Sequence, residues 1–244
     1  PSTEKNSNEI IEELNMIEDL DENCDIEKLK EINVKSVDLI FEDKPQKSLD
    51  ILKKLENFLE NKVIDIKANI NKKLLIIILH NIACCYQKLK DYDNCINYLE
   101  AVIYHFDKLI EQKHNIKINE EYFDNLIKTP NHKYNSDLLG DLILELRFCA
   151  KFHLQMGVVL SESKRDIESL KHIKLAALIC EDNLIKTTYL YNQLKDSLLK
   201  NDDNNGNENS EILSIKQQIK LNYKIIFELN KRVMNLRNNY NFNN

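Results

Sequence analysis

Apolar side chains recur through most of the chain at the three- and four-residue spacing that places them on one face of an α-helix. In the stretch from Lys73 to Lys90, an apolar stripe is followed by a polar turn at 91–93 and then by a second striped stretch. Altogether the pattern predicts helices over about 10–20, 26–43, 45–61, 73–90, 93–112, 136–162, 166–182, 185–199 and 210–237.

Residues that favour turns join several of these helices in pairs. Pro45 disfavours helical geometry in the residue before it, but it is accepted in the first turn of the following helix. Ser163-Lys164-Arg165 separates a later pair. The chain contains three glycines and three prolines, too few for the positive-φ turns that β-hairpins need. We therefore predict an all-α fold of antiparallel helix pairs and exclude an all-β fold.

Polar stretches set the expected domain boundaries. Residues 1–22 are predicted to form a short acidic helix that docks on a helical domain over 23–199. That domain contains a long polar insert at 113–135, and an Asn-rich loop at 200–209 separates it from a C-terminal helix in 210–244. An insert of this length is usually either functional or disordered.

The stretch 79–103 carries a further pattern of small and large residues on two successive helices. Ala83 and Cys95 are small enough to let the helices approach closely, while Tyr86 and Leu99 fill the groove between them. This arrangement resembles a tetratricopeptide repeat, with Leu79 where that family often carries Trp. The residues that match the family's packing positions are Leu79, Ile82, Ala83, Tyr86, Tyr92, Cys95, Leu99 and Val102.

Two other stretches fit the same pattern less closely. In the later one the expected aromatic is replaced by Asp166, and the matching positions are Gly157, Leu160, Ser169, Ile173 and Ala176. In the earlier one Pro45 takes the aromatic position, and the matching residues are Ser36, Leu39, Ser48, Leu52 and Leu55. If Ser48, Cys95 and Ser169 are equivalent, the repeats are 47 and 74 residues apart, against 34 in the family. The repeats are thus divergent and interrupted.

The resemblance implies an α-solenoid that binds other proteins, because such helix pairs bury their apolar faces by stacking on neighbours. A subset of the family grips C-terminal carboxylates with Lys, Asn and Arg on the first helices of successive repeats. In the central repeat Asn81 matches that subset, but His80 and Cys84 occupy the other positions where the subset carries its carboxylate-binding residues. Lys151 matches in the later repeat, where Gln155 replaces the expected Arg. These departures argue against a carboxylate clamp.

The last predicted helix has the alternating three- and four-residue steps of a heptad seam. One interpretation is a helix that caps the end of the solenoid; the other is a coiled-coil-like helix that binds a partner chain, in which the polar Asn222 fixes the register. Because further apolar residues widen the stripe, we expect contacts on two sides. The seam residues are Ile212, Ile215, Ile219, Asn222, Ile226, Leu229, Val233 and Leu236.

Charge and hydropathy restrict the class of partner. Charged residues make up 30% of the chain at a net charge of −6, and no cluster of Lys and Arg suits a nucleic acid. The longest apolar run, Leu74–Leu79, is far shorter than the roughly 20 residues of a membrane-spanning helix. Residues 1–9 are polar, unlike a signal peptide. We expect a cytoplasmic protein, associated in a narrower interpretation with the cytoskeleton, whose partners are other proteins.

Sequence motifs for chemistry give no positive signal. We identify no Gly-rich phosphate loop, no nucleophile elbow and no His-Glu-x-x-His motif. Because neither Cys-x-x-Cys, His-x-x-x-His nor a paired His–Cys spacing typical of zinc is recognised, no metal or other cofactor is expected. Five of the six cysteines fall in apolar helical patterns and are interpreted as reduced core residues. The protein is not expected to be an enzyme.

Two classes of function follow from this pattern. The favoured one is a non-catalytic scaffold or adaptor subunit that holds other proteins through helix contacts. A narrower version places it in a cytoskeletal or axonemal assembly. The alternative is a co-chaperone or regulatory module that reads the end of a peptide.

Overall fold

The computed structural model describes residues 26–62, 68–119, 122 and 136–200, together with isolated positions between 214 and 231. Every regular element in these residues is an α-helix, and no strand occurs among them, which confirms the predicted all-α fold. None of the described helices is long and apolar enough to cross a membrane. The predicted docking helix within 1–22 lies outside the described residues.

The chain divides into two compact units, Pro1–His105 and Phe106–Asn244. The boundary falls inside helix α5 (Tyr92–His114), so the predicted domain at 23–199 extends over both units. The insert begins after α5, where Asn115 adopts a left-handed backbone with φ of 55°, a conformation that often ends a helix.

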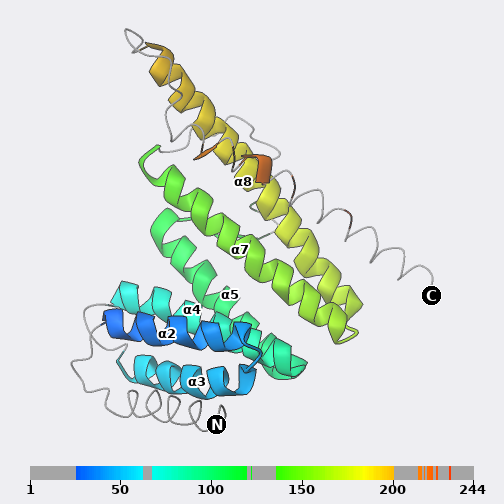
Figure 1. Ribbon diagram of the computed structural model, residues 1–244. Helices are drawn as coiled ribbons and strands as arrows, with labels where there is room; N and C mark the ends of the chain where they lie inside the picture. The colour runs from blue at the N-terminus through cyan, green and yellow to red at the C-terminus, as the bar shows by residue number, and fades with distance from the viewer. Residues whose placement is uncertain are drawn as a thin grey trace, which may run out of the picture. The chain divides into compact units, whose positions relative to one another are not determined.

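Unit 1 contains α2 (Ile26–Phe41), α3 (Pro45–Lys62), α4 (Ala68–Leu89) and the first part of α5. Helix α4 packs against both α2 and α3, as the adjacent ribbons in Figure 1 show. Helix α4 also begins five residues before the predicted start near Lys73. The core of the unit consists of apolar side chains that are fully buried, among them Leu52, Leu55, Ile78, Ile82 and Leu99.

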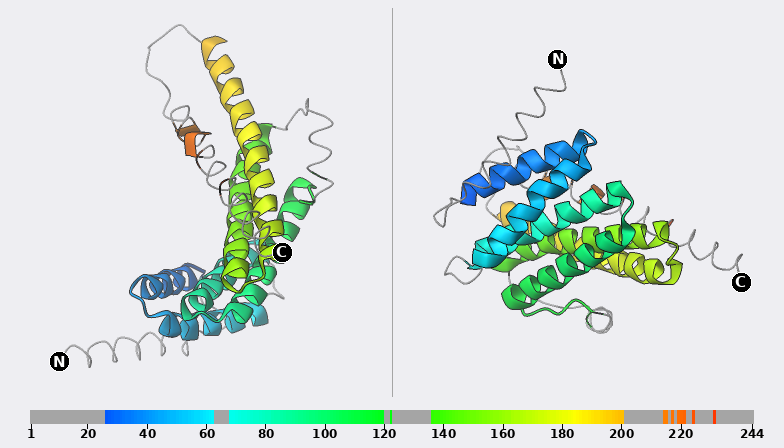
Figure 2. Two further views of the ribbon diagram at one scale, coloured as in Figure 1. Left: turned by 90° about the vertical axis from the view of Figure 1, so that its right-hand side faces the viewer. Right: turned by 90° about the horizontal axis from the view of Figure 1, so that it is seen from below.

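Unit 2 contains the end of α5, α7 (Ser136–Glu162) and α8 (Asp166–Lys200). Helices α7 and α8 form an antiparallel pair and lie side by side along most of the length of α7, as Figure 1 and Figure 2 both show. Its buried core includes Ile110, Leu146, Met156, Val159 and Ile179.

The two helices of each pair are joined by the same turn. Asp43, Lys90 and Lys164 follow α2, α4 and α7, and their φ angles of 59°, 59° and 64° are left-handed. Each donates its N–H to the carbonyl three residues earlier, and the next residue donates to the carbonyl five residues earlier. These two bonds define a Schellman motif, which satisfies the last carbonyls of a helix. We call this arrangement the hairpin turn; it recurs at three distant places in the chain.

One predicted interruption is wrong. Separate helices were expected over 166–182 and 185–199, whereas α8 runs without a break from Asp166 to Lys200. Asp182 and Asn183, which stand at the predicted break, are buried. Asp182 pairs with Lys186 one turn later, and Asn183 donates to the Ile143 carbonyl of α7. Their polar groups are therefore satisfied inside the helix interface, and the helix continues.

Candidate functional site

One hydrogen bond crosses each helix pair between the residues that the sequence pattern aligned. The bonds run from Ser48 Oγ to the Ser36 carbonyl at 2.7 Å, from Cys95 Sγ to the Ala83 carbonyl at 3.2 Å, and from Ser169 Oγ to the Gly157 carbonyl at 2.6 Å. In each pair the donor lies twelve residues after the acceptor and five after the left-handed residue of the hairpin turn. We call these contacts the seam hydrogen bonds, and they extend the likeness of the three pairs from the turn into the interface.

Most of the predicted repeat-packing residues are buried. Tyr86 and Tyr92 are half-buried, and the ring of Tyr86 lies against that of Tyr98 with centroids 5.6 Å apart. The fully enclosed positions are Leu79, Ile82, Ala83, Cys95, Leu99, Val102, Gly157, Leu160, Ser169, Ile173 and Ala176.

The positions expected to form a carboxylate clamp have different surroundings. Asn81 donates from Nδ2 to Asn33 Oδ1 at 2.8 Å, so its amide already joins α4 to α2. His80 and Cys84 are half-buried on α4. In unit 2, Lys151 is exposed and Gln155 is half-buried on α7.

The predicted partner-binding residues lie largely outside the described part of the chain. Ile215 is buried and Ile219 is half-buried. The others, which the structure leaves undescribed, are Ile212, Asn222, Ile226, Leu229, Val233 and Leu236. The choice between a cap helix and a coiled-coil-like helix therefore stays open.

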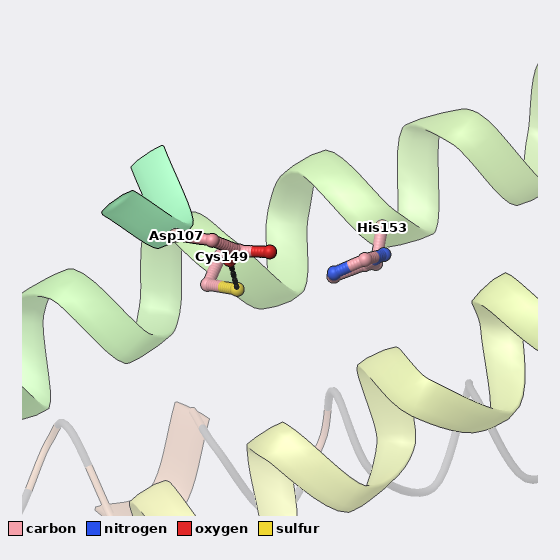
Figure 3. Close-up of side chains that lie close together, drawn as sticks. All are labelled: Asp107, Cys149 and His153. Atoms are coloured by element: carbon pink, nitrogen blue, oxygen red, sulfur yellow. Dashed lines mark hydrogen bonds between the residues drawn. The ribbon is translucent and has the colours of Figure 1, made fainter. Parts of the chain in front are cut away.

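Unit 2 also brings together three side chains that the sequence did not single out. Asp107 extends from α5, while Cys149 and His153 extend from neighbouring turns of α7 (Figure 3). One oxygen, sulfur or nitrogen atom from each lies within 4.8 Å of the other two. Cys149 Sγ donates to Asp107 Oδ1 across 3.7 Å. We call these three residues the Asp–Cys–His cluster.

Contacts on both sides of Asp107 fix its position opposite α7. Phe106 packs edge-on against Phe152, with ring centroids 5.2 Å apart. Further along α5, Lys113 Nζ lies 2.7 Å from an Asp141 oxygen and 3.0 Å from a Glu145 oxygen. These contacts hold the end of α5 against α7 and keep the carboxylate of Asp107 beside the thiol of Cys149.

A second histidine supports the cluster from α8. His172 Nδ1 lies 3.0 Å from His153 Nδ1, and the two rings stack with centroids 5.2 Å apart. One of these nitrogens must carry the shared proton, because a hydrogen bond needs one donor and one acceptor. Because this contact uses Nδ1 of His153, the other ring nitrogen, Nε2, is the one that can face the cluster.

Burial sets the protonation of the cluster. It raises the pKa of Asp107 to about 6 and raises the pKa of Cys149 well above its usual value, with the Asp107 charge adding to the second effect. Burial, reinforced by His172, lowers the pKa of His153 to about 3. At neutral pH the thiol is protonated and the imidazole is neutral. The cluster therefore lacks the thiolate that a cysteine nucleophile requires.

Only part of this cluster has a signal in the sequence. Cys149 and His153 are four residues apart, a spacing that places both side chains on one face of a helix. That spacing could have indicated a ligand pair. Asp107 comes from another helix 42 residues earlier, and no local pattern connects it to Cys149.

A separate buried polar cluster lies further along α8. The side chain of Lys186 is 0% exposed and forms an ion pair with Asp182. The Tyr122 hydroxyl donates to Asp182 Oδ2 at 3.0 Å and accepts from Lys186 Nζ at 3.1 Å. Thr187 donates to the Asn183 carbonyl at 2.7 Å. These contacts attach one residue of the insert to α8.

Taken together, the fold and its contacts define an all-α protein of antiparallel helix pairs with buried polar clusters in unit 2. No family model matches the chain, and no curated protein matches it. The likeness to tetratricopeptide repeats stays a prediction that rests on the residue pattern.

Proposed function

We propose that this protein is a non-catalytic scaffold that holds other proteins on surfaces built from its helix pairs. The observation that carries the proposal is the recurrence of the hairpin turn and the seam hydrogen bond in three pairs. Repeated helix pairs pack side by side and leave extended outer surfaces, which repeat proteins use to bind partners.

The pairs are best interpreted as divergent tetratricopeptide repeats that stack as an α-solenoid. Each pair has a small residue, Ser36, Ala83 or Gly157, whose carbonyl accepts the seam hydrogen bond from the second helix. The twelve-residue separation within each seam hydrogen bond is constant, so the unequal spacings of 47 and 74 residues arise in the outer parts of the helices and in the connections between pairs. Extra length between repeats is compatible with stacking, because each repeat contacts mainly its neighbours.

Affinity purification of the full chain from its native cells, followed by mass spectrometry, tests the scaffold proposal. We expect a defined set of proteins to co-purify in constant ratio and to migrate with the chain in size-exclusion chromatography. Cytoskeletal or axonemal proteins in that set would support the narrower form of the proposal. Recovery of the chain alone, as a monomer at physiological salt, would contradict it.

Charge substitutions at exposed apolar residues locate the binding surface in the same experiment. Leu144 on α7 and Ile185 on α8 are 49% and 60% exposed, so Leu144→Asp and Ile185→Asp alter the surface with little effect on the core. Lys174→Glu, at an exposed position of α8, is the matched control. We expect one of the apolar variants to lose partners at unchanged helix content, while the control retains them. Equal recovery with all three variants would place the binding surface away from these faces.

A module that reads peptide ends is the alternative function, and it makes a different prediction. It would use the exposed Lys151 of α7 to bind a carboxylate. Fluorescence titration with an acidic C-terminal peptide distinguishes the two functions. Micromolar, salt-sensitive binding that is lost in Lys151→Ala would favour the alternative, and no binding would favour the scaffold.

A further inference from the structure

We propose that Asp107, Cys149 and His153 form a transition-metal site, and that Zn²⁺ is the ion their ligand atoms fit best. The three side chains converge from α5 and α7 within unit 2 (Figure 3). The site would join α5 to α7, and it does not depend on the scaffold proposal.

The chemistry of the three ligands selects the class of ion. A thiolate, an imidazole and a carboxylate are the three side-chain types that zinc sites use. Mg²⁺ and Ca²⁺ prefer sets made entirely of oxygen atoms, and a single carboxylate does not meet that preference. The mixed set therefore favours Zn²⁺, with Co²⁺ as a close substitute in the same geometry.

The distances are close to those that such an ion imposes. Zinc bonds of about 2.0–2.3 Å at tetrahedral angles hold neighbouring ligand atoms about 3.5 Å apart. Cys149 Sγ and Asp107 Oδ1 are already 3.7 Å apart. The longest separation in the cluster is at most 4.8 Å, so a side-chain movement of roughly 1 Å closes the set around an ion.

Burial of the ion is balanced by the charge of its ligands. Cys149 and His153 are buried and Asp107 is half-buried, so an unmatched charge at this position would be strongly unfavourable. A divalent cation bound to one thiolate and one carboxylate has no net charge. Binding transfers the Cys149 proton to solvent, because a thiol that coordinates a metal is deprotonated.

His172 supplies the second contact that metal-bound histidines usually have. It holds Nδ1 of His153 at 3.0 Å, which leaves Nε2 for the ion and fixes the orientation of the ring. Figure 3 shows the His153 ring extending along α7 toward Cys149 and Asp107. Three protein ligands leave a fourth coordination position for water or for another ligand.

Titration of the metal-free full chain with CoCl₂ tests the site directly. We expect a thiolate-to-cobalt charge-transfer band that saturates at about one equivalent of cobalt and disappears when ZnCl₂ is added. Absence of this band at saturating cobalt would overturn the proposal.

Four variants assign the ligands. Cys149→Ser is expected to lose the charge-transfer band, and Asp107→Asn to weaken cobalt binding. His172→Ala is expected to weaken it roughly 10–100-fold, as loss of a supporting contact does elsewhere. Cys85→Ser is the matched control, because Cys85 is equally buried but lies in unit 1. A band that persists in Cys149→Ser, or that vanishes in Cys85→Ser alone, would overturn the assignment.

A measurement on the unaltered chain keeps the proposal testable if Cys149→Ser fails to fold. With ¹⁵N-labelled histidine, ZnCl₂ should shift the Nε2 resonance of His153 and leave its Nδ1 protonated. An unchanged His153 spectrum at one equivalent of zinc would overturn the proposal, whatever the variants show.

Discussion

The helix pairs α4/α5 and α7/α8 share one hairpin turn and one seam hydrogen bond but differ in what they bury. Among the described residues of α4 and α5, the thiols of Cys85 and Cys95 are buried, and the one ionisable side chain that is almost fully buried is that of His114, which lies at the unit 2 end of α5 and contacts Glu145 of α7. In α7/α8 the buried polar and charged residues are Glu145, His153, Ser169, Asp182, Asn183, Lys186 and Thr187.

This difference distinguishes the contacts that every helix pair needs from the buried polar groups that only some pairs contain. The turn and the seam hydrogen bond occur in both pairs, so they belong to the common architecture. Buried ionisable groups are unfavourable unless they are paired, and they contribute little to a fold that an apolar interface already stabilises. Among the described residues, α3 of unit 1 buries one ionisable residue, Glu56, whereas α7/α8 buries Glu145, His153, Asp182 and Lys186. This difference indicates a task specific to unit 2, which we infer to include metal binding.

The largest expected effect comes from breaking the buried ion pair of unit 2. Asp182→Ala leaves Lys186 without its carboxylate and should lower the free energy of unfolding by about 3–5 kcal/mol. Asn81→Ala, which breaks the half-buried amide pair with Asn33 in unit 1, should lower it by about 1 kcal/mol. Urea unfolding followed by circular dichroism measures both changes.

A double variant provides the control for that comparison. Replacing the ion pair with apolar residues, as in Asp182→Leu with Lys186→Met, should restore most of the lost stability, because neither charge is then left unpaired. A cost below about 1 kcal/mol for Asp182→Ala would contradict a buried, mutually dependent pair.

A smaller effect is expected at Gly157, which leaves no room for a side chain between the helices of the third pair. A Cβ atom at Gly157 would lie 2.4 Å from Ile173 Cγ1 and 3.2 Å from the Ser169 carbonyl oxygen, so Gly157→Ala should destabilise by about 1–3 kcal/mol. Gly140 lies on the same helix and has open space around it. Gly140→Ala should therefore stabilise by about 0.5–1 kcal/mol. If Gly157→Ala and Gly140→Ala change the stability equally, then α7/α8 accepts a methyl side chain at Gly157, as α4/α5 does at the equivalent Ala83.

The smallest predicted effect concerns the turns that both pairs share. Lys90 and Lys164 adopt left-handed φ angles that glycine accepts more easily, so Lys90→Gly and Lys164→Gly should each stabilise by about 0.5–1 kcal/mol. Lys174→Gly, at an exposed site within α8, should destabilise by about 1 kcal/mol. Thermal unfolding in parallel measures the three variants, and opposite signs at Lys90 and Lys164 would show that the two turns are not alike.

The helix pairs could be predicted from the sequence because their determinants are local. Apolar spacing indicated the helices, and the small residues Cys95 and Ser169 marked the seams. The described ends of α7 and α8 also agree with the turn predicted at Ser163-Lys164-Arg165.

The buried polar clusters could not be predicted because their determinants are distant in the chain. Asp107 on α5 meets Cys149 on α7 although the two residues are 42 positions apart in the chain. Asp182 and Lys186 have the composition of a solvated surface, and their burial depends in part on Tyr122, 60 residues before Asp182. Charged residues in a helical pattern are usually exposed to solvent, whereas Asp182 and Lys186 are buried.

The equivalence of the three pairs is tested most directly by exchanging the donors of the seam hydrogen bonds and measuring the free energy of unfolding. Serine and cysteine are both small donors, so Ser48→Cys, Cys95→Ser and Ser169→Cys should each change it by less than about 1 kcal/mol. Valine at the same three positions lacks the donor and adds a branch, and it should cost about 1–3 kcal/mol more. If Cys95→Ser is as costly as Cys95→Val, the three contacts are not equivalent and the repeat architecture is contradicted.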